Sequence, residues 1–337
     1  MCRPAPDPEP TLFTAIQVAG PMPVKVGFVG AGTIGANSIF ATLALTDRIT
    51  EIAVVDVVEA AAVGRAMDLN TAAVAFGRRT RVHGGTDYAL LRGASVVVVS
   101  AGLPRKPGMT RADLLSKNIT ILKDVCANVR RNAPDCVLLL VTNPVDILLY
   151  IAWKELGFPR ERVIGMTSLH DSSRFTDIVR DATGDRDVRA TILGEHGETM
   201  FVSPTLSSPK LKGGDWEAWE KTTRGRAMEI IERVGATAYA PGACTGRMVK
   251  AIVEDTHEEI PTGVILMGEY GHRDVATGVP AVLGRGGLVR VVQYDLSAVE
   301  KAKLEVTVKA VKEKIAEGLH ILANPPAPTP APAPKTA

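Results

Sequence analysis

The chain of 337 residues has only four cysteines, few aromatic residues and no long apolar run. Its cysteines form no C-x-x-C pair and have no histidine nearby at a metal-ligand spacing, so we expect no metal site and no disulfide framework. Free thiols are typical of proteins in the reducing cytoplasm, which is the location that we predict. No apolar stretch approaches the roughly 20 residues that a membrane-spanning helix needs, so we expect no membrane partner.

An excess of one charge is also missing. The 39 basic and 37 acidic residues leave a net charge of +2, with both signs interspersed, whereas a nucleic-acid partner would need a concentrated basic face. Residues 1–23 carry too few basic residues and too short an apolar segment for a signal peptide. Residues 324–337 are rich in proline and alanine, a composition that stays extended and unpacked. We expect both ends to be disordered extensions.

Apolar strand-like runs alternate with helix-length segments in the first half. The runs are VKVGFVG, EIAVVDV, ASVVVVSAG and DCVLLLVTNP, and stretches such as GANSIFATLAL and RADLLSKNITILKDVCANVRRN lie between them. Strands that are apolar throughout and separated by helices predict a parallel sheet covered on both faces. We therefore predict an α/β fold whose first part, residues 24–164, is a doubly wound Rossmann domain.

The pattern changes after about residue 165. A closing amphipathic helix, AVEKAKLEVTVKAVKEKIAEGLHIL, has apolar residues at helical spacing. We interpret residues 165–323 as a second, α+β catalytic domain. Its other predicted elements are helices near 171–183, 215–235 and 246–256 and strands near 261–268, 278–283 and 288–293.

A glycine-rich turn follows the first predicted strand. The segment GAGTIG places Gly30, Gly32 and Gly35 in G-x-G-x-x-G spacing between a strand and a helix. In a dinucleotide site the first glycine allows the tight turn, the second lets the backbone approach the pyrophosphate, and the third permits close helix–strand packing. The free N–H groups of the helix N-terminus would bind the phosphates. The alternative is that the glycines serve only the geometry of the turn.

Asp56 favours NAD over NADP as the cofactor. It ends the next predicted strand, 21 residues after Gly35, and its carboxylate would accept hydrogen bonds from the ribose hydroxyls. The same charge would repel a 2′-phosphate, and the segment DVVEAA supplies no arginine to bind one.

Three charged side chains of the second half suit acid–base chemistry. His196, in LGEHGETM, follows a strand-like run, where we expect it to be exposed. Asp171 and Arg174, in HDSSRFTDIV, stand at i and i+3 of a helix start and project from one face. A carboxylate bonded to Nδ1–H fixes the tautomer of a histidine and raises its pKa, which makes a usable proton donor. The arginine suits bidentate capture of a carboxylate. Taken singly, they also fit a loop histidine, a helix cap and a solvated arginine.

Together these motifs resemble the lactate/malate dehydrogenase family, and within it the lactate-dehydrogenase-like malate enzymes. The resemblance runs from about residue 24 to about residue 322. It is carried, in order, by GAGTIG, VVD, AGLPRKPGMTRADLL, VTNPVDI, HDSSRF, GEHGETM and GEYG…GVPAVLGRGG.

The resemblance implies roles for individual residues. His196 would be the acid/base, Asp171 its carboxylate partner, and Arg174 the anchor of the substrate carboxylate. Asn143 would contact substrate and the nicotinamide side, and its bond to Pro144 would be cis. His170 replaces a residue that is usually apolar, so it could perturb the His196–Asp171 pair or serve in a subunit contact. Further pocket or cofactor contacts are assigned to Thr33, Ile34, Asn118, Thr237 and Pro241.

The Gly/Pro-rich segment AGLPRKPGMTRADLL corresponds to a lid that closes over substrate and cofactor in this family. Arg111 would polarise the reacting carbonyl, because its charge offsets the negative charge that develops on oxygen. Arg105 would select the substrate: lactate enzymes typically carry glutamine there, whereas the lactate-like malate enzymes carry arginine. An arginine pairs with the second carboxylate of oxaloacetate, and with pyruvate bound it would be buried without an anion.

The expected activity is therefore reversible hydride transfer between NADH and oxaloacetate, the malate step of the tricarboxylic acid cycle, in a homo-oligomer that is a dimer or tetramer. One alternative is a lactate or other L-2-hydroxyacid dehydrogenase, from which Arg105 separates it. The other is a non-catalytic NAD-binding regulatory protein. Such a protein would have no reason to retain the charged residues Arg111, Asp171, Arg174 and His196 together.

Overall fold

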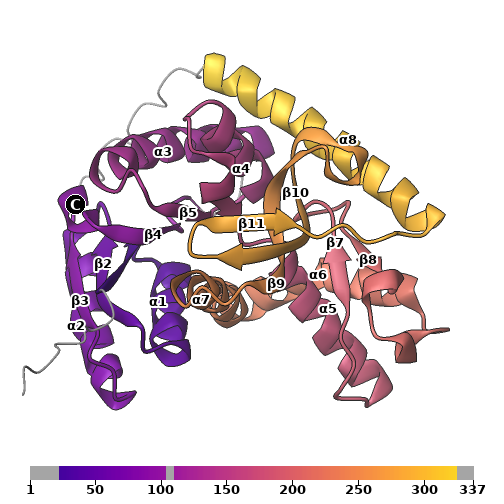
Figure 1. Ribbon diagram of the computed structural model, residues 1–337, viewed down its shortest axis with the longest axis horizontal. Helices are drawn as coiled ribbons and strands as arrows, with labels where there is room; N and C mark the ends of the chain where they lie inside the picture. The colour runs from indigo at the N-terminus through magenta and orange to yellow at the C-terminus, as the bar shows by residue number, and fades with distance from the viewer. Residues whose placement is uncertain (1–22, 104–109, 325–337) are drawn as a thin grey trace, which may run out of the picture.

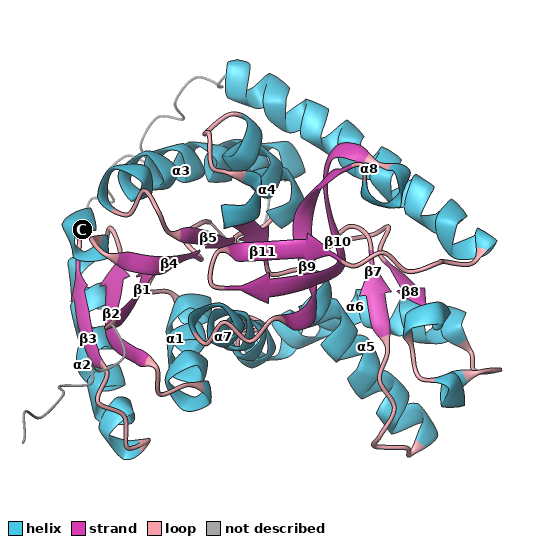
Figure 2. Ribbon diagram, in the orientation of Figure 1, coloured by secondary structure: helices cyan, strands magenta, loops and turns pink. Residues whose placement is uncertain are grey.

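The computed structural model of the chain describes residues 23–103 and 110–324. These residues form one mixed sheet of nine strands with helices on both of its faces, and a separate sheet of two strands (Figure 1, Figure 2). The predicted extensions 1–22 and 325–337 lie outside the described residues, as does the loop segment 104–109 with Arg105.

Six parallel strands form the part of the sheet that comes from the first half of the chain. Their spatial order is β3-β2-β1-β4-β5-β6, which is the strand order of a dinucleotide-binding Rossmann sheet. The four predicted strands are all present, and their valine- and leucine-rich runs are buried, as a sheet covered on both faces requires. The strands are β1 (Val24–Val29), β2 (Ile49–Val55), β3 (Arg81–Gly85), β4 (Ala94–Val99), β5 (Val137–Leu140) and β6 (Val163–Gly165).

Four helices connect these strands. The third begins after a capping box, in which the side chains of Thr110 and Asp113 each accept a hydrogen bond from the other's backbone N–H. It spans the same residues as the predicted helical stretch. The helices are α1 (Thr33–Leu45), α2 (Glu59–Ala75), α3 (Arg111–Asn132) and α4 (Val145–Lys154).

The second half adds three antiparallel strands to the same sheet. β9 joins β6 through the pair Gly263 and Gly165, and β10 lies between β9 and β11. One apolar core therefore runs through both halves of the chain. The three predicted strands are present, the first two longer than expected: β9 (Glu258–Met267), β10 (Arg273–Gly284) and β11 (Gly287–Val291).

Four more helices and the two-stranded sheet complete the second half. α7 begins at Tyr239, earlier than predicted, because Pro241 is tolerated in the first turn of a helix, where its missing N–H would have no partner. α8 buries the apolar residues that its spacing predicts, among them Leu304, Val308 and Val311. The elements are α5 (Ser168–Thr183), α6 (Trp216–Val234), α7 (Tyr239–Val253), α8 (Ala298–Ala323), β7 (Thr191–Leu193) and β8 (Phe201–Ser203).

The helices of the two halves pack against one another across the molecule. Figure 1 shows α3, α4 and α8 on one side of the sheet and α1 with α7 on the other. The contact between α1 and α7 is close, because α7 presents glycines to it. A Cβ atom on Gly242 would lie 2.9 Å from the backbone of Asn37, and one on Gly246 would lie 3.0 Å from that of Ala41. The second half is thus held against the helix that follows the glycine turn.

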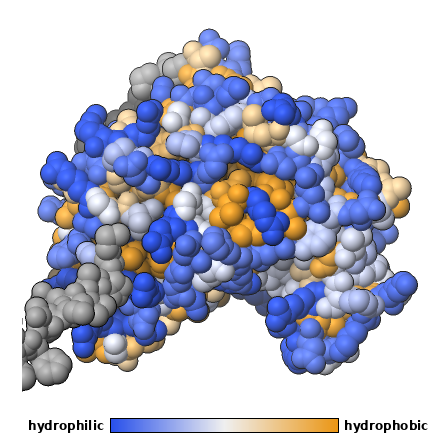
Figure 3. Space-filling view, in the orientation of Figure 1, coloured by the Kyte–Doolittle hydropathy of each residue, from blue (hydrophilic) through white to orange (hydrophobic). Residues whose placement is uncertain are grey.

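Polar and charged side chains cover most of the face drawn in Figure 3. An apolar patch interrupts them near the middle of the view, in the region where Figure 1 shows the strands of the second half. Val289 of β11 is among the exposed apolar residues of that half. Within residues 23–103 and 110–324, no helix has the length and apolar character to cross a membrane.

A buried glutamate ties the start of α8 to β8. Glu300 closes a capping box with Ser297 and also accepts hydrogen bonds from the hydroxyls of Ser203 and Thr205. Burial alone would raise the pKa of Glu300, but the hydrogen bonds from Ser203, Ser297 and Thr205 outweigh it and lower the pKa to about 2. The charged carboxylate is therefore a stabilising group in the fold.

Glu300→Gln should destabilise the protein at neutral pH. A carboxyl whose pKa is lowered from 4.5 to about 2 stabilises the folded state by about 3 kcal/mol above pH 4.5, and this contribution is lost as the pH falls towards 2. We expect denaturant unfolding at pH 7 to give a loss of that order, and the difference in stability between wild type and variant to shrink as the pH falls from 4.5 towards 2. Glu317→Gln, at an exposed position of the same helix, is the control; equal stability of the two variants would contradict the prediction.

Candidate functional site

The glycine turn joins β1 to the N-terminus of α1. Gly30 has a φ of +109°, which residues with a side chain rarely adopt, and its N–H donates to the carbonyl oxygen of Val55 on β2. A Cβ atom on Gly35 would lie 2.0 Å from the carbonyl oxygen of Gly30. The turn therefore needs glycine at both positions to keep its shape.

Gly32 differs from its neighbours, because nothing in the fold requires it to lack a side chain. It is the exposed N-cap of α1 with a φ of −69°, and a Cβ atom there would meet no atom within 4 Å. No side chain caps this helix, and its first turn holds no acidic residue. The N–H groups at Thr33 and Ile34 and the positive end of the helix dipole therefore remain available to an anion. An open backbone of this kind fits the pyrophosphate of a dinucleotide.

Asp56 directly follows β2 and faces the glycine turn. Its Oδ2 accepts the N–H of Ala31 at 2.7 Å and its Oδ1 accepts the N–H of Val58 at 2.9 Å. The side chain is partly exposed, and a carboxylate has about four lone-pair sites. It therefore keeps acceptor capacity for the hydroxyls of a ribose beside the turn.

Asn118 and Asn143 meet where α3 passes the end of β5. The buried Asn118 amide donates to the carbonyl oxygens of Asn143, at 2.8 Å, and Leu103, at 3.3 Å, and it accepts the N–H of Leu103 at 2.8 Å. Both N–H groups of the Asn118 amide thus donate hydrogen bonds within the protein. Asn118 therefore holds the chain around the site and has no free donor for a cofactor. Asn143 is exposed, and its peptide bond to Pro144 is cis, as the resemblance implies.

His196 and Asp171 form a short hydrogen bond between two elements of the second half. Nδ1 of His196, three residues beyond β7, lies 2.7 Å from Oδ2 of Asp171 on α5. The prediction that His196 is exposed is wrong: its side chain is only 15% exposed and that of Asp171 only 2%. The loop after β7 folds inward, because the backbone N–H of His196 donates to Oδ2 of the buried Asp146 at 2.8 Å.

The pair is strongly coupled electrostatically. Burial alone would lower the pKa of His196, but the charge and hydrogen bond of Asp171 outweigh it and raise that pKa. Burial alone would raise the pKa of Asp171, but the charge and hydrogen bond of His196, together with the charge of Arg174, outweigh it and lower that pKa. The geometry therefore favours a charged carboxylate that holds the Nδ1–H tautomer and leaves Nε2 of His196 for a proton transfer.

Asp146 is a part of this cluster that sequence reasoning missed. Burial raises its pKa to about 7, against the opposing effects of the His196 N–H and side chain. The signal was present in the motif VTNPVDI, because an aspartate among apolar residues at the start of a buried helix requires a partner. Its partner is a backbone group 50 residues further along the chain, which no local pattern identifies.

Arg174 lies one turn after His170 on α5, with its guanidinium between two other members of the cluster. Its Nη1 is 3.6 Å from Oδ1 of Asp171, and its Nη2 is 3.0 Å from Nε2 of His170. His170 is only 5% exposed within the chain, so of the two roles considered for it, its position favours an effect on this cluster over a subunit contact. His170, Asp171 and His196 together offer ligand atoms within 4.8 Å of one another. The guanidinium of Arg174 already contacts two of these residues, His170 and Asp171. A metal ion at this place would therefore have to displace the guanidinium.

The structure gives fewer contacts for the remaining predicted residues. Arg111 begins α3, and its Nη2 is 3.7 Å from a carboxylate oxygen of Glu198, with both side chains mostly exposed. Thr237 is half-buried in the connection between α6 and α7, and Pro241 is buried in the first turn of α7. Arg105 lies outside the described residues.

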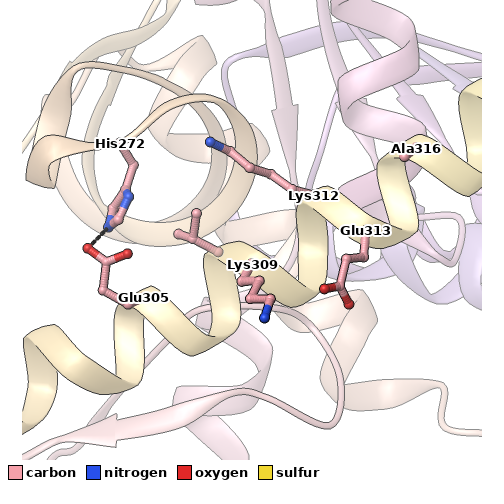
Figure 4. Close-up of a pocket in the computed structure, with 7 residues that line it drawn as sticks. His272, Glu305, Lys309, Lys312, Glu313 and Ala316 are labelled. Atoms are coloured by element: carbon pink, nitrogen blue, oxygen red, sulfur yellow. Dashed lines mark ion pairs between the residues drawn. The ribbon is translucent and has the colours of Figure 1, made fainter.

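A cavity of about 470 Å³ lies elsewhere, along α8 (Figure 4). Figure 4 shows His272 beside Glu305, with an ion-pair distance of 3.6 Å between them. Lysines and glutamates alternate along its wall, so it has no net charge that would select a substrate. None of the residues predicted for catalysis or cofactor binding lines it.

The fold and the charged cluster define an NAD-binding oxidoreductase of the Rossmann type. The family model described as the NAD-binding domain of lactate/malate dehydrogenase matches residues 24–165, and the model of the α/β C-terminal domain matches residues 167–322. The chain belongs to the lactate/malate dehydrogenase family.

Individual relatives are similar over almost their whole length. A malate dehydrogenase of Archaeoglobus fulgidus is 48% identical over 295 residues, which are 87% of this chain and 99% of that protein. The structure of malate dehydrogenase from that organism in complex with NADH matches with a TM-score of 0.83. A minor L-lactate dehydrogenase of Enterococcus mundtii, 30% identical, matches with a TM-score of 0.82 and covers 87% of this chain and 98% of its own.

Two alanine substitutions should separate cofactor binding from folding. Gly32→Ala adds a methyl group where there is open space, so we expect an unchanged melting temperature but NADH binding weakened by about tenfold or more, because the methyl group would occupy the place of the pyrophosphate. Gly35→Ala is the matched control and should lower the melting temperature, because its Cβ would overlap the Gly30 carbonyl. NADH titration and thermal unfolding measure both effects, and undiminished NADH affinity in Gly32→Ala would place the pyrophosphate elsewhere.

Proposed function

We propose that this chain is an NAD-dependent malate dehydrogenase that transfers hydride reversibly between NADH and oxaloacetate. The observation that carries the proposal is the buried pair of His196 and Asp171 with Arg174 beside it. This cluster occurs in a member of the family whose relatives named malate dehydrogenase reach 48% identity.

In the proposed reaction, His196 gives a proton to the oxygen of the substrate carbonyl during reduction. Asp171 keeps the proton of Nδ1 in place and stabilises the charged ring, so the proton that moves is on Nε2. The pKa of His196 is raised by Asp171 in spite of burial, which makes the ring a better proton acceptor and stabilises its protonated form. In malate oxidation the same nitrogen accepts the proton.

Two arginines would complete the reaction centre. We assign to Arg174 the capture of the carboxylate next to the reacting carbonyl, because its guanidinium is largely buried and fixed by neighbours on α5. Arg111 would stabilise the negative charge that develops on the carbonyl oxygen. In the structure its side chain is mostly exposed and lies near Glu198, which is two residues after His196 in the sequence.

The cofactor would lie across the glycine turn. Its pyrophosphate would bind at Gly32 and the first turn of α1, and its adenosine ribose at Asp56, which bonds the turn from the opposite side. Bound NADH supplies the hydride. Asn143, Thr237 and Pro241 would line the nicotinamide and substrate end of the site. The proposed cofactor contacts at the glycine turn and Asp56, and the proposed catalytic cluster in the second half, support residues 24–164 as the NAD-binding domain and residues 165–323 as the catalytic domain.

Oxaloacetate is preferred to pyruvate in this proposal because of Arg105. Its charge would pair with the second carboxylate, which pyruvate lacks. The similarity to solved lactate dehydrogenases, at 30–31% identity, shows how little the fold itself discriminates. An L-lactate dehydrogenase is accordingly the second candidate, and the higher identity to malate enzymes weighs against it.

We further propose a homo-oligomer, dimer or tetramer, in the cytoplasm, acting in the tricarboxylic acid cycle. Exposed apolar residues at helical spacing on α2, Val63, Met67 and Val74, support an interface. Three cysteines within the described residues are buried free thiols, which suits a reducing compartment.

His196→Asn should abolish turnover without loss of cofactor binding. The variant removes the proton donor but keeps a polar side chain, so we expect the turnover number with oxaloacetate to fall by about 100- to 10,000-fold. The dissociation constant for NADH should stay unchanged. His83→Asn, at an exposed position on β3, is the control and should behave as the wild type. Normal turnover in His196→Asn would exclude the assigned acid/base.

Arg105→Gln should shift the substrate preference from oxaloacetate towards pyruvate. We expect the ratio of kcat/KM for oxaloacetate to that for pyruvate to fall by about 100-fold, because a charge-assisted hydrogen bond to the second carboxylate is lost. Lys106→Gln removes the adjacent charge as a matched control and should leave the ratio unchanged. A wild type that reduces pyruvate as well as oxaloacetate would retain the family assignment but overturn the substrate.

A further inference from the structure

His170 is a buried polar residue that neither the proton transfer nor the cofactor site uses. It lies on α5 directly before Asp171, with 5% of its surface exposed. Its Nε2 is 3.0 Å from Nη2 of Arg174, one helical turn later. At i and i+4 of a helix, the two side chains are neighbours on one face.

The partner fixes the chemical state of the ring. A guanidinium has only N–H donors, so Nε2 of His170 must be the acceptor and carry no proton. The ring is therefore neutral, with its proton on Nδ1. That Nδ1 is buried and has no hydrogen-bond partner within the part of the chain that the structure describes. Burial, together with the Arg174 charge, lowers the pKa of His170 to about 3, which agrees with a neutral ring.

A buried, unpaired donor costs free energy, so an apolar side chain would be the more stable choice at this position unless Nε2 contributes something in return. What Nε2 provides is an acceptor on one edge of the Arg174 guanidinium, while Asp171 lies 3.6 Å from Nη1. With two of its nitrogens directed towards neighbours on its own helix, the planar group has a defined orientation. An apolar residue fills the same space but exerts no such directional force.

We infer that His170 is a positioning residue that orients Arg174 for the carboxylate of the substrate. The inference rests on the proposed function, in which Arg174 captures that carboxylate. A substrate that binds a preset guanidinium loses less free energy in ordering the side chain. Loss of the acceptor should therefore weaken substrate binding much more than it slows the proton and hydride transfers, which use other groups.

The test compares His170→Leu, which fills the space without an acceptor, with His170→Gln, whose amide oxygen can accept from Arg174. We expect His170→Leu to raise KM for oxaloacetate by about tenfold, with kcat changed much less. His170→Gln should recover most of the affinity. NADH affinity and melting temperature control for folding. A KM within about twofold of the wild type in His170→Leu, or an equal rise in both variants, would overturn the inference.

A second measurement does not depend on turnover or on a folded leucine variant. ¹⁵N NMR of wild-type protein labelled at its six histidines, with the His170 signals identified by their absence in His170→Gln, distinguishes the two neutral tautomers and the charged ring. The inference predicts the Nδ1–H tautomer at pH 7, and any other state overturns it. If the wild type proves inactive with oxaloacetate, the proposed function fails, but this NMR result still decides whether His170 accepts from Arg174.

Discussion

The buried carboxylate of Asp171 is the group on which the rest of the site depends. It is almost inaccessible to solvent, yet it lies 2.7 Å from His196 and 3.6 Å from Arg174. A charge in such a place is tolerated only when it is paired, and its two partners are the groups to which the proposed reaction assigns the proton transfer and the substrate carboxylate. The proposed acid/base and the proposed carboxylate anchor are therefore placed by one electrostatic requirement and not by two separate ones. Because Asp171 and Arg174 share one helix, only His196 has to be brought from elsewhere, and the buried Asp146 holds its backbone.

Helix packing beside this cluster brings together two segments that are distant in the sequence, the glycine turn with α1 and the helix α7. The glycine turn opens α1, and α7 of the second half packs against α1 so closely that Gly242 and Gly246 leave no room for a Cβ. The same α7 carries Pro241, which is buried at its start. The cofactor half and the substrate half therefore meet through rigid helix packing.

The sequence predicts much of this fold, and the failures have physical causes. Long apolar runs identified the main strands, and the helix-length segment between two of them identified α3, because these signals are local. β3 and β6 were not predicted, because they are short and their glycines interrupt the apolar pattern of a buried strand. The glycine at position 84 is required by packing, because a Cβ atom there would lie 2.1 Å from the carbonyl oxygen of Ala62 on α2. In the site, residue types and spacing identified His196 and its neighbours. The burial of His196 and the contribution of Asp146 depend on contacts between distant segments, which a pattern of neighbours does not contain.

The continuous sheet makes each half of the chain depend on the other. β6 is bonded to β9, so the cofactor half ends in a strand whose outer edge the other half covers. Cut at Gly165, it would present an unprotected edge, a site for self-association, and would lose its share of the common apolar core. In the proposed reaction the two halves supply different groups, but they share one sheet and one core and are therefore not interchangeable modules. Either half on its own would expose apolar surface that the other half covers in the intact chain.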